Sequence, residues 1–345
     1  MKYFDTHCDT IEKIYNFGGN LFENSYHVDL KRLSKYENFA QIFAAFVDKE
    51  NLPHNGTVVG ADDSVRPQAN NSCTHRRTES SAPTQRFLNL IECYHSQITE
   101  FSEHITHCNT AADVSQSFEN GKIAAMLAIE GGEALGGDLD NLQKFYNLGV
   151  RILTLTWNYD NELGCGALGG DSGLTDFGFA VVREMNQLGM IIDVSHLNEA
   201  GFWDVINTSR APVIASHSNA QAVCPHVRNL SDKQISALID MRGYIGLNLY
   251  SDFLTAGGQS RPPLQNETNA DINGIQLHIE HFEKLGAGGI LGLGCDFDGV
   301  DKLPHGICGV QDISKIPLSE DIAFNNFYNF LAKNIDTRNN LKGVI

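Results

Sequence analysis

The sequence predicts an α/β fold, a single (β/α)₈ barrel that spans residues 1–345. Three observations support it: short apolar runs recur along the chain, amphipathic segments alternate with them, and polar residues follow several of the runs. Nearly continuous apolar runs are typical of parallel strands, which are covered on both faces. A doubly wound open sheet is the alternative. The barrel is favoured because it brings the C-terminal ends of all its strands to one face, where polar groups on many strands can meet.

Eight strands and a set of intervening helices are expected from these runs. The strands are Tyr3–Thr6, Phe39–Val47, Ile123–Ile129, Arg151–Trp157, Met190–Val194, Val213–Ser216, Tyr244–Leu249 and Ile290–Gly294. The helices are Asn141–Asn147, Phe177–Leu188, Glu199–Thr208, Asp232–Met241, Ile272–Leu285 and, near the end, Glu320–Lys333. Thr175 and Ser231 are suitable N-caps, and glycines at 149, 189, 243 and 286 fall just past helix ends.

The segment Pro53–Gln85 does not fit the alternation of strands and helices. It contains three valines and no Leu, Ile, Met or aromatic residue, so it can supply little core. We therefore expect an irregular polar insert or loop within the one domain. Its Cys73-Thr-His75 is too sparse a pair of ligands to predict a metal site.

Composition excludes several classes of function. A formal charge of −17 and a pI near 5.1 argue against partners such as nucleic acid or an anionic membrane surface. No run approaches the roughly 18 apolar residues of a membrane span, and no signal peptide is recognisable at the start. The eight cysteines form no Cys-x-x-Cys pair and are expected to be reduced thiols. We expect a cytoplasmic protein, with a homodimer left open.

Five potential metal ligands stand at the ends of predicted strands: His7, Asp9, Glu130, His196 and His217. The first two are on the same side of an extended strand, because strand side chains alternate with a period of two. Each residue alone has a structural explanation, such as a satisfied core histidine or a buried salt bridge. Together, at the same face of a barrel, they predict a binuclear metal site that hydrolyses its substrate.

A carboxylate that moves protons is expected after the last predicted strand, in Gly292–Gly299. Asp296 and Asp298 both qualify. A metal lowers the pKa of bound water to about 7, so a modest base suffices. Asp296 is closer to the strand and is preferred, whereas Asp298 is assigned to capping the following loop.

Motifs over nearly the whole chain resemble those of one known family. They are Phe4–Thr10, Ala128–Gly132, Leu153–Asn158, Gly173–Gly178, Val182–His196, Ile214–Asn219, Arg228-Asn229 and Gly294–Gly299. The sequence is similar to the membrane (renal) dipeptidase family, peptidase family M19, which comprises zinc-dependent dipeptidases of the amidohydrolase superfamily. The resemblance is strongest to soluble bacterial members. His-x-Asp on the first strand, in place of the commoner His-x-His, points to this family within the superfamily.

The resemblance implies roles for the predicted site residues. His7, Asp9 and Glu130 would hold one Zn²⁺, and Glu130, His196 and His217 the other, with Mn²⁺ or Co²⁺ as substitutes. Asp296 would be the acid/base group, Arg228 would pair with the substrate carboxylate, and Tyr250 would line the cleft. Where the mammalian enzyme places a histidine for transition-state contact, this chain has Trp157-Asn158, which we assign to substrate binding with that histidine's role left open.

The implied activity is hydrolysis of dipeptides by a metal-bridging hydroxide, with tolerance for a D-residue at the C-terminal position. Two alternatives remain at this stage. One is another amidohydrolase reaction, such as deacylation of N-acyl amino acids, in which Arg228 would serve equally well. The other is a barrel that binds ligand without catalysis because the polar insert or a short tail has impaired it.

Overall fold

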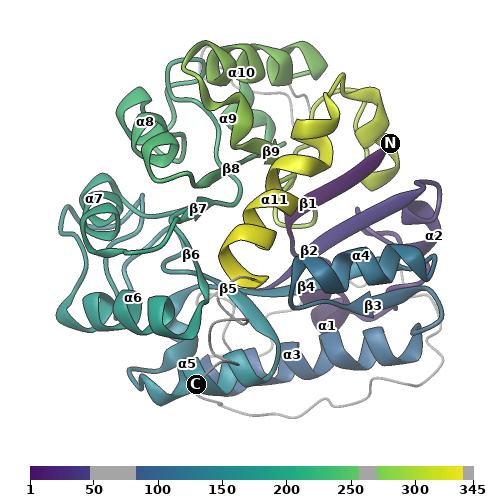
Figure 1. Cartoon of the computed structure of the whole chain (residues 1–345), viewed down its shortest axis with the longest axis horizontal. Helices are drawn as coiled ribbons and strands as arrows, with labels where there is room; N and C mark the ends of the chain where they lie inside the picture. Colours follow the sequence, from purple (N-terminus) through teal and green to yellow (C-terminus); the bar gives the residue numbers. More distant parts are fainter. Residues whose placement is uncertain (47–82, 256–269, 337–345) are drawn as a thin grey trace, which may run out of the picture.

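Nine parallel strands form the sheet of the computed structural model, which describes residues 1–46, 83–255 and 270–336 (Figure 1). The strands are β1 (Lys2–Cys8), β2 (Asn38–Phe46), β3 (Ile105–His107), β4 (Ile123–Glu130), β5 (Val150–Thr154), β6 (Ile191–Asp193), β7 (Ile214–Ala215), β8 (Tyr244–Leu247) and β9 (Leu291–Leu293). Eight of them close into a ring, because β2 pairs with both β1 and β4 while β9 pairs with both β8 and β1. The ring confirms the predicted (β/α)₈ barrel.

Helices surround the ring of strands. They are α1 (Thr10–Phe17), α2 (Leu30–Leu33), α3 (Pro83–Glu100), α4 (Ala111–Glu119), α5 (Asp140–Asn147), α6 (Asp176–Leu188), α7 (Glu199–Thr208), α8 (Asp232–Asp240), α9 (Ser251–Leu254), α10 (Ile272–Lys284) and α11 (Asn326–Leu331). The predicted caps are present: Thr175 Oγ1 accepts from the Gly178 N–H, and Ser231 forms a capping box with Gln234. No helix in the described ranges has the length and apolarity that crossing a membrane requires.

Several elements were not predicted from the sequence: the strand β3 and the helices α1, α2, α3, α4 and α9. Helix α3 begins at Pro83, so the last three residues of the predicted insert Pro53–Gln85 are helical, and residues 47–82 lie outside the described ranges. Strand β3 pairs with the first residues of β4, and it is not one of the eight strands of the ring. Several predicted strands were also too long at their C-terminal ends. Val213–Ser216 shortens to Ile214–Ala215, because the Ser216 N–H bonds to the Asp193 side chain instead of a neighbouring strand.

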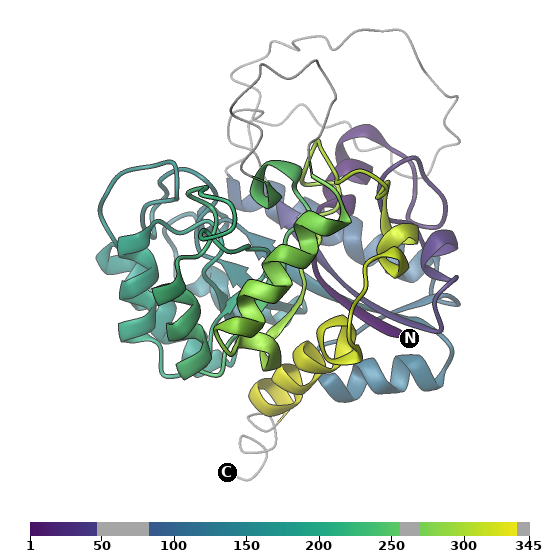
Figure 2. The ribbon, with the colours of Figure 1, turned by 90° about the horizontal axis from the view of Figure 1, so that it is seen from above.

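The N-terminal end of the barrel is closed by the helical stretch around α11, which crosses it in Figure 1. Phe327 packs against Phe4 and Tyr244 from the starts of β1 and β8, with ring centroids 4.7 and 4.6 Å apart. Phe324 and Phe330 extend this aromatic cluster. In Figure 2 the yellow helical stretch around α11 lies at the lower end of the barrel. Aromatic packing therefore fills this end of the barrel.

Candidate metal centre

The five predicted ligands converge at the C-terminal end of the barrel. His7 is near the end of β1, Asp9 precedes α1, and Glu130 is the last residue of β4. His196 and His217 follow the short strands β6 and β7. All five are buried. The parallel ring explains why residues so distant in sequence meet.

Glu130 lies between two sets of ligands. Its Oε2 is 3.4 Å from His7 Nε2, and His7 Nε2 is 3.3 Å from Asp9 Oδ2. Its Oε1 is 2.9 Å from His196 Nε2 and 3.6 Å from His217 Nε2. Each carboxylate oxygen thus faces a different set, an arrangement that suits a carboxylate shared by two cations.

The donor atoms at this site fit a metal better than they fit one another. His196 Nε2 and His217 Nε2 are 2.7 Å apart, while the Nδ1 atoms of the same rings contact Asn158 Oδ1 and Ser216 Oγ. His7 Nε2 and Asp9 Oδ1 are buried without a hydrogen-bond partner among the described residues. Buried polar atoms are rarely left unpaired, so this donor set fits a bound cation.

Electrostatics favour the metal-binding forms of the two later histidines. Burial, and then the positive charge of Arg228, lowers the pKa of His196 to about 4. Burial, and then the charge of His7, lowers the pKa of His217 well below its ordinary value. Neutral imidazole is the form that ligates metals.

The backbone around the ligands is strained. His196, Asp296 and Asp298 have φ angles of 70°, 60° and 69°, in the left-handed region that favours glycine. Such conformations cost free energy and concentrate at functional sites. A Cβ at Gly299 would overlap the carboxylates of Asp296 and Asp9, so only glycine fits beside them.

Asp296 lies at the edge of the ligand cluster. Its Oδ1 is 3.9 Å from His7 Nε2, and its Oδ2 accepts a 2.8 Å hydrogen bond from Asn248 Nδ2. Its carboxylate, His7 and Asp9 offer atoms close enough together to hold an ion, as do His7, Glu130 and His217. Burial raises the pKa of its carboxyl group. Asn248 was not among the residues predicted from the sequence, although a polar residue in the apolar run Gly246–Tyr250 was a signal of it.

Asp298 makes structural contacts instead. Its Oδ1 accepts from the His27 backbone N–H at 2.8 Å, and its Oδ2 accepts from Thr10 Oγ1 at 2.5 Å. It therefore joins the loop after β9 to α1 and to the segment before α2.

Arg228 is buried in the loop between β7 and α8, with 5% of its surface exposed. Its guanidinium is 5.6 Å from the centre of the Phe253 ring, and Nε and Nη2 have no hydrogen-bond partner among the described residues. Burial lowers its pKa to about 10, and the carboxylates of Asp296 and Glu130 oppose that shift. A buried guanidinium with free donors beside the ligand cluster is prepared to bind an anion.

Comparison with known proteins now decides the family. A sequence model of the membrane dipeptidase family, peptidase family M19, matches residues 1–335. This chain belongs to that family. Among solved structures, it is 27% identical to dipeptidase AC, a metallopeptidase of family M19, with a TM-score of 0.79 over 97% of this chain and 98% of the other. Membership of a metallopeptidase family implies a metal cofactor, and residues of this cluster form groups that could hold an ion.

Two further structures extend the comparison. A metallopeptidase from Rhodobacter sphaeroides, with a bound phosphinate mimic of the dipeptide L-Ala-D-Ala, is 27% identical over 97% of this chain and 99% of the other, with a TM-score of 0.77. The probable dipeptidase PvdM from Pseudomonas aeruginosa shares the fold, at 19% identity, a TM-score of 0.79 and coverage of 98% of this chain and 96% of the other.

Of the three remaining predicted residues of this M19 chain, Trp157 and Asn158 lie beside His196 of the cluster. Tyr250 is half-buried against Phe253, and its hydroxyl donates to Asp252 at 3.0 Å. The Trp157 ring lies between Phe46 and His196, at centroid distances of 5.2 and 6.4 Å. Asn158 contacts His196 Nδ1, so its side chain supports a ligand rather than facing free space.

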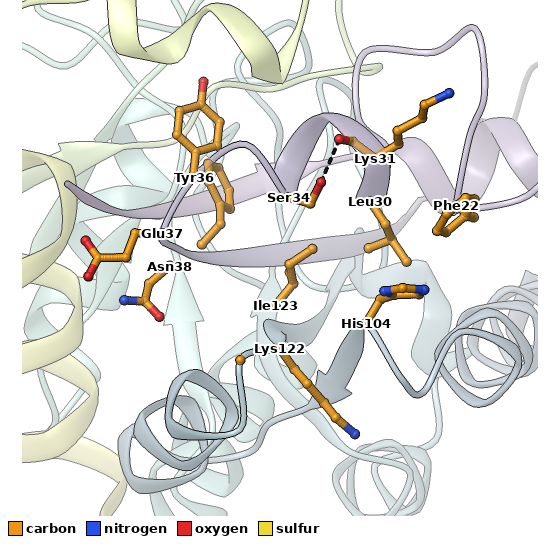
Figure 3. A pocket seen from close by; sticks show the side chains of 12 residues that line it. Phe22, Leu30, Lys31, Ser34, Tyr36, Glu37, Asn38, His104, Lys122 and Ile123 are labelled. Atoms are coloured by element: carbon orange, nitrogen blue, oxygen red, sulfur yellow. Dashed lines mark hydrogen bonds between the residues drawn. The ribbon is translucent and has the colours of Figure 1, made fainter.

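A separate pocket of about 360 Å³ contains none of the predicted site residues. It is lined by Asn38 and Ile123 at the starts of β2 and β4, together with Tyr36, His104 and Lys122 (Figure 3). These strand starts are at the end of the barrel opposite the cluster of predicted ligands, so the pocket is separate from that cluster.

Proposed function

We propose that this M19 dipeptidase uses two zinc ions and selects its substrates by the free C-terminal carboxylate. The observation that carries the proposal is Arg228: a buried guanidinium with unpaired Nε and Nη2 whose charge acts on His196 and Asp296. A buried cation normally has a partner in the protein. Here the missing partner is supplied by the substrate.

The residues divide into two ligand sets around Glu130. His7, Asp9 and Glu130 would hold one zinc, and Glu130, His196 and His217 the other; Mn²⁺ or Co²⁺ would suit the same oxygen and nitrogen donors. When bound, such a pair supplies an activated water and polarises the carbonyl of the scissile bond. The short contacts of both Glu130 oxygens with histidine nitrogens support the shared position.

Asp296 is proposed as the group that moves the proton. Asn248 holds Oδ2, which leaves Oδ1 facing the ligand cluster. Burial raises the pKa of this carboxyl group, so it accepts a proton more readily than an exposed aspartate would. The proton taken from water at Oδ1 would then pass to the leaving amine.

Arg228 would measure the substrate from its C-terminal end. Its planar guanidinium suits a carboxylate, and it holds the carboxylate rather than the side chain. A D-residue at that position would therefore be accepted. The L-Ala-D-Ala mimic bound by the Rhodobacter sphaeroides relative agrees with this proposal.

The experiment compares Gly-L-Ala, Gly-D-Ala, their C-terminal amides and N-acetyl-alanine with wild type and Arg228→Ala. We expect cleavage of both dipeptides and little of the amides. Truncating one partner of a buried charged pair costs roughly 2–5 kcal/mol, so Arg228→Ala should lose about 30- to several-thousand-fold in kcat/KM. The loss should be seen with the free acids and be much smaller with the amides.

Other outcomes would change the assignment. Equal cleavage of acids and amides by wild type would contradict carboxylate selection. Preference for N-acetyl-alanine over the dipeptides would favour deacylation, and cleavage of neither class would indicate an impaired barrel. An unaffected Arg228→Ala would move the anchoring role to another residue.

A further inference from the structure

A buried chain of hydrogen bonds leads from Asp193 through Ser216 to the metal-facing histidine His217. Asp193 ends β6 and is fully buried. Its Oδ2 accepts from Ser216 Oγ at 2.5 Å and from Thr154 Oγ1 at 2.6 Å. Ser216 Oγ in turn lies 2.7 Å from His217 Nδ1. Ser216 and His217 are consecutive residues after β7, while Asp193 and Thr154 end the neighbouring strands β6 and β5, so the barrel itself assembles the chain.

The remaining bonds of Asp193 hold it in place. Its Oδ1 accepts from the backbone N–H groups of Ser195 and Ser216, at 3.0 and 2.9 Å. With Thr154 and Ser216, four neutral groups donate to this one carboxylate. These bonds fix the position of the Asp193 carboxylate, so it can orient the Ser216 hydroxyl group.

The hydrogens available in this series of hydrogen bonds determine which ring nitrogen of His217 is protonated. Ser216 has a single hydroxyl hydrogen, and a carboxylate only accepts, so the 2.5 Å contact requires that hydrogen to point at Asp193. Ser216 Oγ can then only accept from His217, so the hydrogen of this ring is on Nδ1. The weaker 3.4 Å contact with Ser195 does not compete for the hydroxyl hydrogen.

The lone pair of His217 is consequently on Nε2. That atom lies 3.6 Å from Glu130 Oε1 and 2.7 Å from His196 Nε2, inside the ligand cluster. We propose that Asp193 and Ser216 are positioning residues that set the tautomer of His217 and thereby its affinity for a metal ion. This inference rests on the proposed metal site and adds the residues that prepare it.

The two hydroxyl groups that donate to Asp193 Oδ2 offer a matched pair of variants. Ser216→Ala and Thr154→Val each remove one hydroxyl from the same carboxylate oxygen, but only Ser216 also contacts His217. Partners of this kind typically contribute about 10- to 100-fold in metal affinity. Competition for Zn²⁺ with a chelator should therefore show a loss of that size in Ser216→Ala, while Thr154→Val stays close to wild type.

A second measurement tests the tautomer directly. Nitrogen NMR of the histidine rings in the metal-free full chain, with His217 assigned through His217→Gln, should show the hydrogen on Nδ1. A hydrogen on Nε2 would overturn the proposal, and this holds even if Ser216→Ala fails to fold.

The outcomes separate this inference from the proposed function. Equal loss of zinc affinity in both variants, or wild-type affinity in Ser216→Ala, would overturn the positioning role. If wild type in either case still binds zinc and cleaves dipeptides, the proposed function stands. A wild type that binds no zinc would overturn both.

Discussion

The two ends of the barrel are built from opposite kinds of residue. At the N-terminal end, Phe4, Tyr244 and Phe327 fill the interior with aromatic rings 4.6–4.7 Å apart. At the C-terminal end the interior contains carboxylates and imidazoles, among them Glu130 and His217, on a backbone that is strained at His196, Asp296 and Asp298.

This difference separates stability from function along the barrel axis. The aromatic end gains free energy from apolar burial and needs no partner. The opposite end buries charges and unpaired atoms that are costly until a metal binds them. The two ends should therefore respond differently to substitution.

The largest effect is expected for Glu130→Gln. Removing the shared negative charge should lose both metal and nearly all turnover, by more than the roughly 100-fold typical of residues behind the ligands. The stability of the metal-free protein should change little. Metal analysis, dipeptide assays and thermal melting of this variant provide the test. If Glu130 were only half of a core salt bridge, stability would fall while metal and activity persisted.

The converse change at the other end is Phe327→Ala. Phe327 is 2% exposed and packs against three aromatic rings, so its removal leaves a cavity that should cost about 3–5 kcal/mol. Chemical denaturation measures that loss. Zinc affinity and turnover of the folded fraction should remain at the wild-type level. A comparable fall in zinc affinity would show that the two ends are coupled.

A smaller effect concerns pH and the buried His278 of α10. Its Nδ1 accepts from the Ala220 N–H at the start of the Arg228 loop, and burial lowers its pKa to about 4. A histidine with a depressed pKa takes up its proton more readily when unfolded, so stability should fall as pH drops from about 6.5 to about 4. The full contribution of His278 to this loss of unfolding free energy is about 3 kcal/mol.

His278→Asn tests this because it keeps an acceptor and does not titrate in this range. The variant should be less stable near neutrality, and the fall of its unfolding free energy with acid should be shallower by up to about one proton. Slopes that coincide with those of wild type would show that His278 does not titrate between the folded and unfolded states.

The convergence of the predicted ligands could be expected because each is signalled locally, by a polar residue near the end of an apolar run. His7, Glu130 and His217 follow this pattern, and the fold alone accounts for their convergence. Asp193 and Asn248 follow it too, but their partners lie 23 and 48 residues away. The role of such residues depends on contacts that strand periodicity does not reveal.

The elements that sequence analysis missed have a similar explanation. Strand β3 is three residues long, and two of its side chains are only half-buried, so it lacks the continuous apolar run of the others. Helix α3 directly follows the polar residues 53–82, whose composition hid its start at Pro83. Short or edge elements are stabilised by tertiary contacts more than by their own pattern.

We propose that the residues at the C-terminal end of the barrel hold a bridged pair of metal ions, with which the protein would hydrolyse dipeptides. The most direct test titrates metal-free protein with Zn²⁺ while Gly-L-Ala hydrolysis and bound metal are measured together. Five ligands are too many for one tetrahedral zinc, so activity should rise until about two ions are bound per chain. Full activity with one ion per chain, or with none, would show that a bridged pair is not needed for hydrolysis.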